Sequence, residues 1–203
     1  MIVVNFSTGH YLRGQQRLKD SLQGVEFMGL TSYGEVRTPS HENSPYHFKI
    51  GAIKRALEKD PIVLWADSSL YRVGDLSKIQ TIIETDGYFM EEAGHYVKDW
   101  CDEPTLNYFG IDRSTPFTMF SAGLLGLNFN TDIAKQFFER WEKSAVDGHF
   151  RGSWKTHRHD MTCGSIIASQ LGMKYQTGGT HLAYIGQGYS KPKDGVVFYC
   201  QGM

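Results

Sequence analysis

Short apolar segments of strand character alternate with segments of helical periodicity along this chain, and that alternation restricts its possible folds. Three continuous apolar stretches have the composition of strands buried on both faces of a sheet, namely 1–6 (MIVVNF), 62–66 (IVLWA) and 122–129 (AGLLGLNF). Helices are expected at about 11–22, 44–59, 75–86, 132–146 and 160–171, and short strands at about 173–177, 181–185 and 196–200. Such alternation predicts an α/β fold with a mostly parallel central sheet and helices on both faces.

The size and the content of the chain indicate one globular domain. A length of 203 residues is typical of a single core, so we expect one domain over 1–203. The segment 88–118 is aromatic and is interrupted by Pro104 and Pro116, which indicates an excursion over a site. The formal charge of −1 gives no basic field of the kind that attracts nucleic acid, although a local basic groove remains compatible with it.

Neither a leader peptide nor a membrane-spanning run is recognisable in the sequence, so we expect a cytoplasmic protein. Its three cysteines, Cys101, Cys163 and Cys200, are odd in number and widely spaced. This pattern fits buried thiols in a reducing compartment better than a disulfide framework.

The ends of the predicted strands supply the first candidate functional residues. Ligands of open α/β sheets bind outside the carboxyl ends of the strands, which here are Phe6-Ser7-Thr8 and Asp67-Ser68. Asp67 directly follows a fully apolar strand, where an unpaired carboxylate is costly to bury. It is therefore either a turn or cap residue, or a ligand for a divalent cation or a ribose hydroxyl.

A second cluster, His157-Arg158-His159-Asp160, precedes the last helix. One interpretation is a helix N-terminus capped by Asp160, since acidic residues are favoured there. The other is a catalytic or substrate-holding carboxylate with histidines around it. A metal-dependent hydrolase that uses His157, His159, Asp160 and His181 is the alternative function from a different class.

Two lysines are candidates for binding phosphate. Lys49 lies on the helix that precedes the Asp67 strand, and Ser44-Pro45 is expected to cap that helix. Lys191 lies in a glycine-rich C-terminal loop, where backbone amides and a point charge can hold an anion. A solvated lysine and an ordinary surface loop are the simpler interpretations.

In order along the chain, the segments IVLWADSS, FSAGLLGLNFN, HRHDMTCGSIIASQLG and THLAYIGQGYSKPK resemble the GT-A type of nucleotide-diphospho-sugar transferase. The order of these segments resembles the glycogenin and lipopolysaccharide galactosyltransferase group. The segment SPYHFKIGAIKRALEKDPIVLWADSS is closer to small bacterial and phage glycosyltransferase-like proteins. The resemblance implies a single GT-A-like (Rossmann-like) domain.

The resemblance also implies roles for individual residues. The reaction centre would contain Asp160 with His159, and the metal would be bound by Asp67 and His181. The residues that would bind the donor are Phe6, Ser7, Thr8, Lys49, Asp67, Ser68, Gly123 and Lys191. The implied cofactor is Mn²⁺ or Mg²⁺. Ser69 stands where the family's second aspartate would be, which weakens the expected metal site, and Met161 replaces the glutamine after Asp160.

The expected function is transfer of a sugar from a nucleotide sugar, with a UDP-sugar favoured, to an acceptor hydroxyl. Three acceptors are compatible with the sequence: a hydroxymethylated base in phage DNA, a surface glycan and a lipid-linked sugar. Either of the last two would stack on aromatic residues, which make up 13% of the chain. A catalytically silent module that binds nucleotide sugars is a third possibility, because of Ser69.

Overall fold

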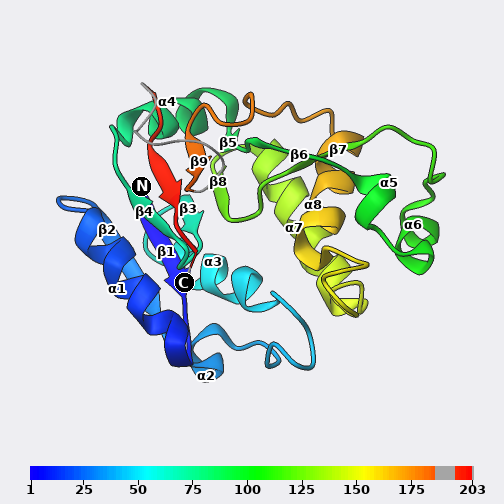
Figure 1. The fold of residues 1–203 in the computed structure, drawn as a ribbon, viewed down its shortest axis with the longest axis horizontal. Helices are drawn as coiled ribbons and strands as arrows, with labels where there is room; N and C mark the ends of the chain where they lie inside the picture. Colours follow the sequence, from blue (N-terminus) through cyan, green and yellow to red (C-terminus); the bar gives the residue numbers. More distant parts are fainter. Residues whose placement is uncertain (186–194, 203) are drawn as a thin grey trace.

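The structure is a computed structural model that describes residues 1–185 and 195–202, and its centre is a five-stranded sheet (Figure 1). The strand order is β2 (Glu26–Leu30), β1 (Ile2–Phe6), β3 (Ile62–Ala66), β8 (Leu124–Asn128) and β5 (Tyr88–Phe89). β1 pairs in parallel with β2 and β3, whereas β8 runs antiparallel to both β3 and β5. Every strand except β8 therefore points the same way, which confirms the expected mostly parallel α/β sheet.

Side chains of β1 alternate between two apolar cores, as the period of a strand requires. Ile2 and Val4 belong to the core beneath α3 (Phe48–Leu57), α7 (Asp132–Val146) and α8 (His159–Gln170). Val3 belongs to the core beneath α1 (Leu12–Ser21) and α4 (Ser77–Asp86). Figure 1 shows α1 on one side of these strands and α3, α7 and α8 on the other. The helices thus cover both faces.

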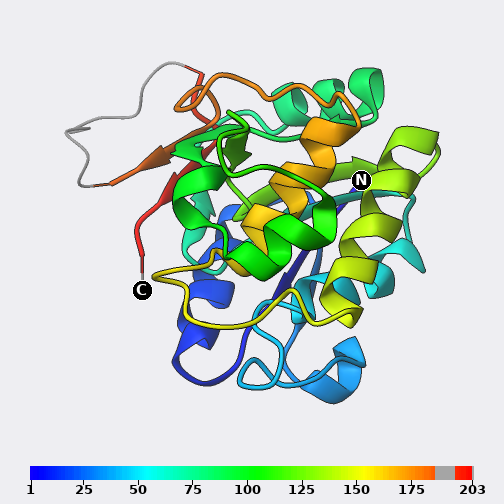
Figure 2. The same cartoon turned by 90° about the vertical axis from the view of Figure 1, so that its right-hand side faces the viewer.

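Smaller elements complete the fold. They are η1 (Gly9–Tyr11), α2 (Tyr33–Val36), β4 (Leu70–Arg72), β6 (Glu92–Tyr96), α5 (Val97–Trp100), α6 (Glu103–Phe109), β7 (Thr118–Phe120), β9 (Leu182–Tyr184) and β10 (Phe198–Cys200). β4, β10 and β9 form a three-stranded sheet, and β6 pairs with β7. The segment 88–118 therefore contributes β5 to the main sheet and then builds β6, α5 and α6; Figure 2 shows α5 and α6 beside α8. No helix in the described ranges has the length and apolar content that crossing a membrane would require.

Two expected helix starts were wrong. α3 begins at Phe48 rather than near Ser44, because Tyr46 adopts a φ of 61° that no α-helix can contain. α8 begins at His159, so Asp160 is a residue of the first turn and not the cap. His159 itself has a φ of 33°. Both deviations adjoin the residues that form the cleft described below.

Close contact between α2 and α3 fixes the helix that carries Lys49. A Cβ atom added at Gly51 would lie 2.1 Å from the backbone oxygen of Val36. We expect Gly51→Ala to lower the free energy of unfolding by about 2 kcal/mol, because the backbones would have to separate. Urea denaturation followed by circular dichroism measures the change.

The control is Gly34→Ala in α2, where the added Cβ would meet only the Ser32 hydroxyl at 3.9 Å. It should leave stability within about 0.5 kcal/mol of the parent. Equal free energies of unfolding in the two variants would show that position 51 does not require glycine for the close contact between α2 and α3.

Candidate active site

A cleft of about 670 Å³ opens where β3 ends and β8 begins. Asp67 directly follows β3, and its backbone N–H donates to the oxygen of Gly123 at 2.8 Å. Asp160 reaches the cleft from the first turn of α8 and Lys49 from the first turn of α3. The antiparallel pairing of β3 with β8 thus brings together residues that are far apart in the sequence.

The ammonium of Lys49 lies between the two carboxylates. Its Nζ is 2.8 Å from Asp160 Oδ2 and 3.4 Å from Asp67 Oδ1, and it donates to the backbone oxygen of Ala122 at 2.8 Å. Lys49 is 2% exposed and Asp160 4% exposed. Two acids and one lysine leave this group with a net charge of −1.

Burial and pairing act in opposite directions on the Lys49–Asp160 pair. Burial raises the pKa of Asp160, and the Lys49 ammonium opposes that rise. Burial alone would lower the pKa of Lys49, but Asp160 and Asp67 outweigh it and hold that pKa above its ordinary value. The lysine therefore remains charged throughout the neutral range and keeps both acids in position.

Asp67 is oriented by its neighbours. The indole Nε1–H of Trp65 donates to Asp67 Oδ1 at 2.8 Å. A Cβ atom added at Gly123 would lie 3.1 Å from Asp67 Oδ2, so glycine leaves this oxygen accessible. One carboxylate oxygen is thus engaged within the protein, and the other faces open space.

Glu91 was not anticipated from the sequence, where it is simply one of two adjacent glutamates. It is 1% exposed, and its carboxylate accepts hydrogen bonds from the backbone N–H groups of Gly179, His181 and Leu182. The Nδ1 of His181 lies 3.1 Å from Glu91 Oε2. This carboxylate holds the segment 179–182 and orients the imidazole. Only burial, which the tertiary structure decides, distinguishes it from Glu92.

The residues expected to bind a metal fit a divalent cation in part. Histidine ligands commonly donate their second ring N–H to a carboxylate, as His181 does to Glu91, which leaves Nε2 as the ligand atom. Asp67 offers Oδ2. In the described residues His181 does not line the cleft, although Gly179 and Leu182 do. Of the two expected ligands only Asp67 lines the described cleft, where Ser69 adds a hydroxyl at most.

Several other expected donor-binding residues lie in a buried polar network. Ser7 Oγ donates to Asn5 Oδ1 at 2.8 Å and is hydrogen-bonded to Ser68 Oγ. Phe6 is buried and stacks on Phe48 with ring centroids 4.8 Å apart. The two serines connect the ends of β1 and β3, whereas Phe6 packs on α3, and none of the three lines the cleft. Thr8 is half-buried just beyond β1, and Lys191 lies outside the described residues.

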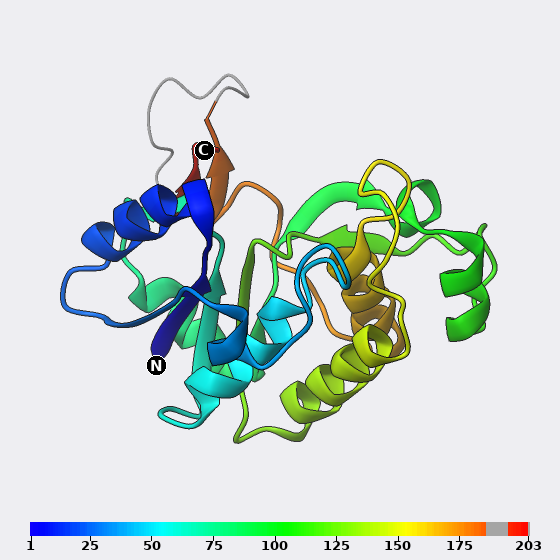
Figure 3. The same ribbon diagram turned by 90° about the horizontal axis from the view of Figure 1, so that it is seen from below.

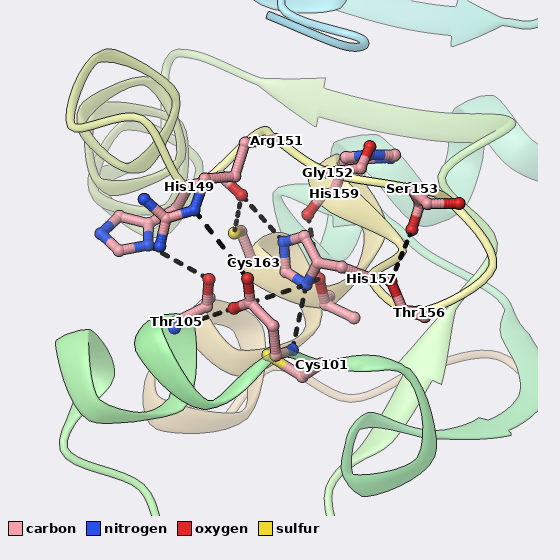
Figure 4. Close-up of polar contacts among 12 residues, drawn as sticks. Cys101, Thr105, His149, Arg151, Gly152, Ser153, Thr156, His157, His159 and Cys163 are labelled. Carbon is pink, nitrogen blue, oxygen red and sulfur yellow. Dashed lines mark hydrogen bonds and ion pairs between the residues drawn. The ribbon is translucent and has the colours of Figure 1, made fainter.

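The two histidines of the 157–160 cluster point in different directions (Figure 4). His157 Nε2 is 2.9 Å from the backbone oxygen of His149, whereas His159 Nε2 is 2.8 Å from that of Gly152. His159 lines the cleft and His157 does not. Asp160 pairs with Lys49 and His181 with Glu91. The four residues do not gather around one point, so the hydrolase alternative is not favoured.

Cys101, Asp102 and His157 do bring three potential ligand atoms within 4.8 Å of one another. Both nitrogens of His157 are already engaged, because Nδ1 accepts from the Asp102 backbone N–H at 3.3 Å. Burial raises the pKa of the Cys101 thiol to about 12, so it is protonated at neutral pH. These contacts join α5 and α6 to the segment before α8, so their role is structural (Figure 4).

The chain was compared with known proteins by sequence and by structure. No protein-family model and no curated protein matches the chain by sequence. Solved structures do match it. The bifunctional glycosyltransferase WbbM matches 92% of this chain over 40% of its own length, with a TM-score of 0.59 and 11% identity. The chain thus spans less than half of WbbM.

Two further structures match over nearly the whole of both chains. A glycosyltransferase involved in glycosylation of the major capsid of PBCV-1 has a TM-score of 0.57, 15% identity, and coverage of 98% of this chain and 92% of its own. The galactosyltransferase LgtC, solved with donor and acceptor sugar analogues, has a TM-score of 0.51, 13% identity, and coverage of 98% and 86%. This chain has the GT-A fold. At these identities the likeness establishes the architecture of the GT-A domain and leaves its activity to be argued from the cleft.

The first prediction for the site concerns Lys49, whose removal leaves the buried carboxylate of Asp160 without its counter-ion and should lower stability. We expect Lys49→Met to lower the free energy of unfolding by about 3 kcal/mol, because it leaves Asp160 buried and unpaired. Without Lys49 the folded-state pKa of Asp160 rises further above its unfolded value. The loss should therefore be larger at pH 8 than at pH 5, as measured by urea denaturation.

The double variant Lys49→Met with Asp160→Asn tests the cause. It removes the buried charge and should recover most of the pH-dependent part of the loss. An equal loss at pH 5 and pH 8 in the single variant would contradict the assignment of Lys49 as the counter-ion of Asp160.

Proposed function

We propose that this GT-A domain, over residues 1–203, is a glycosyltransferase that moves a sugar from a nucleotide sugar to an acceptor hydroxyl. The observation that carries the proposal is the pair Asp67 and Asp160, held by the buried Lys49 in a cleft at the end of β3. A volume of about 670 Å³ is adequate for a ligand of nucleotide-sugar size. A UDP-sugar is the favoured donor.

In the proposed reaction the bond from the anomeric carbon to the diphosphate oxygen breaks, and a bond to the acceptor oxygen forms. The acceptor loses its hydroxyl proton, and the nucleoside diphosphate leaves with the electron pair. Asp160 faces the anomeric carbon, where positive charge develops, and serves as the acceptor's base or as a fixed anion beside that carbon. The configuration of the product distinguishes these two roles. His159 lines the same part of the cleft.

Asp67 and His181 would hold the implied Mg²⁺ or Mn²⁺, whose chemistry is to neutralise charge on the departing diphosphate. A cation suits the electrostatics of this region, because the group formed by Lys49, Asp67 and Asp160 is net negative. Gly123 leaves room for the donor beside Asp67, and Lys191 would supplement the positive charge.

We also propose a reducing compartment, the cytoplasm, for this reaction. Cys101, Cys163 and Cys200 are free thiols, which supports that location. The silent-module alternative retains the same cleft and differs only in turnover, so the activity measurement below separates it from the transferase.

The test is a screen of nucleotide sugars with Mn²⁺ or Mg²⁺. We expect one donor, with UDP-sugars foremost, to raise the melting temperature selectively by mass action and to be hydrolysed or transferred with release of the nucleoside diphosphate. Binding without nucleotide release in the presence of acceptor glycans would favour the silent module. No selective binding by any nucleotide sugar would overturn the proposal.

For the reactive carboxylate, Asp160→Asn should reduce transfer by about a hundredfold or more while the donor still binds. Coupled detection of the released nucleoside diphosphate measures the rate. Glu139→Gln is the control, because it removes an exposed carboxylate from the middle of α7 and should leave the rate unchanged. A rate for Asp160→Asn within twofold of the parent would remove Asp160 from the reaction centre.

Glu91 should affect the metal through His181. We expect Glu91→Gln to weaken Mn²⁺ affinity in the presence of UDP by about 10- to 100-fold, since loss of a carboxylate partner misorients a histidine ligand. Electron paramagnetic resonance of free Mn²⁺ measures the affinity directly. The matched control Glu84→Gln changes an exposed glutamate of α4 and should not alter it. Unchanged affinity in Glu91→Gln with a normal fold would contradict this role.

A further inference from the structure

The segment 148–159, which follows α7 and ends at the first residue of α8, is positively charged. It contains Arg151, Lys155 and Arg158 but no acidic residue, whereas the whole chain has a formal charge of −1. At its centre Trp154 is 53% exposed and lines the cleft. A large aromatic side chain in this position is accessible to a ligand that enters the cleft.

Arg158 is held in a fixed position beside that ring. Its Cζ lies 4.0 Å from the ring centroid of Trp100 and 5.1 Å from that of Trp154. Its Nε is buried without a hydrogen-bond partner, and in the described ranges no carboxylate forms an ion pair with it. By contrast, the Nε of Arg151 lies 3.9 Å from Asp102. Arg158 is thus a positioned cation on the cleft wall whose charge is not neutralised by the protein.

The backbone connects this cation to the reaction centre. Arg158 precedes Asp160 by two residues, and both line the cleft. The Arg158 backbone N–H donates to the oxygen of Trp100 at 3.0 Å, which ties the segment to α5. Figure 3 shows this segment beside α5 and far from α1. A ligand bound on Trp154 and Arg158 therefore lies at the Asp160 side of the cleft.

We infer that Trp154 and Arg158 form the acceptor subsite, and that the acceptor is a sugar that carries a carboxylate or a phosphate. This inference rests on the proposed transferase function. The apolar face of a pyranose stacks on an indole ring, and a guanidinium pairs with an oxyanion through two parallel hydrogen bonds. Stacking between two tryptophans holds the guanidinium plane ready for such a contact.

A charged sugar suits the cleft better than a nucleic acid does. Of the lysines and arginines that line the described cleft, Lys49 is paired with Asp67 and Asp160, whereas Arg158 has no carboxylate partner. Glu91 and Glu92 line the same cleft. A single charged sugar needs only the segment 148–159, whereas a chain of phosphates would also meet these carboxylates. Nucleic-acid binding depends on many phosphate contacts, which a cleft with four carboxylates and a single unpaired arginine provides poorly.

The experiment compares defined probes in the presence of UDP and Mn²⁺. Methyl glucuronide, glucose 6-phosphate, methyl glucoside and a single-stranded oligonucleotide are titrated while Trp fluorescence and ligand-observed NMR are followed. We expect the two anionic sugars to bind at least fivefold more tightly than methyl glucoside. The carboxylate and phosphate probes distinguish which anion the subsite prefers. Equal affinity for neutral and anionic sugars, or tight binding of the oligonucleotide alone, would overturn the inference.

Variants assign the preference to the two residues. Arg158→Gln should abolish the preference for anionic sugars, and Trp154→Ala should weaken all the sugars by about tenfold. The matched control Lys155→Gln removes a neighbouring positive charge that does not line the cleft, and should change the preference by less than twofold. Arg158→Lys keeps the charge but lacks the planar fork, so it should retain only part of the preference.

Affinity for the UDP-sugar is measured separately on the same variants. This measurement distinguishes failure of the acceptor inference from failure of the proposed transferase function. If Arg158→Gln weakens UDP-sugar binding and leaves the sugar preference intact, Arg158 belongs to the donor site and the acceptor inference fails. If the parent protein binds UDP-sugar but none of the sugar probes, the inference fails while the transferase proposal stands. If the parent binds no nucleotide sugar, the proposed function itself fails.

Discussion

One buried ammonium group holds the centre of this molecule together. Lys49 carries a positive charge to the meeting point of three segments: its own helix α3, the end of β3 at Asp67, and the first turn of α8 at Asp160. Lys49 and Asp160 would each be costly to bury alone, so they stabilise one another, and the half-buried Asp67 adds a second carboxylate beside the ammonium. That mutual dependence brings the strand-end carboxylate and the helical carboxylate to one cleft and fixes their separation.

Two residues next to the Lys49–Asp160 ion pair have unusual backbone conformations. Tyr46 and His159 both have positive φ values, one just before α3 and one at the start of α8. For residues other than glycine such conformations cost about 1 kcal/mol each, so the surrounding contacts must stabilise them. The Tyr46 ring centroid lies 5.2 Å from the Lys49 ammonium and 5.5 Å from the His159 ring centroid. Both residues with positive φ therefore line the same cleft, next to Lys49 and Asp160, which form an ion pair there.

Charge is divided within the cleft. Asp67 follows β3 and Glu91 follows β5, and both carboxylates line the cleft. Arg158 also lines it, beside the rings of Trp100 and Trp154. The proposed donor and the proposed acceptor would therefore contact different groups of one cleft. The GT-A fold provides the frame for this division, and the segment 148–159 provides Trp154 and Arg158.

The sequence by itself determined the α/β architecture, because apolar strands and amphipathic helices have periods that can be read locally. It also predicted Asp67, Asp160 and Lys49 as candidate site residues, since polar residues at strand ends and helix starts are exceptional in their immediate context. Only the tertiary structure decided that Lys49 lies between the two acids, that Glu91 is buried against His181, and that Ser7 and Ser68 bond to each other away from the cleft. These outcomes depend on which distant segments pack together and on the cost of desolvating a charge there, and neither is encoded in local spacing.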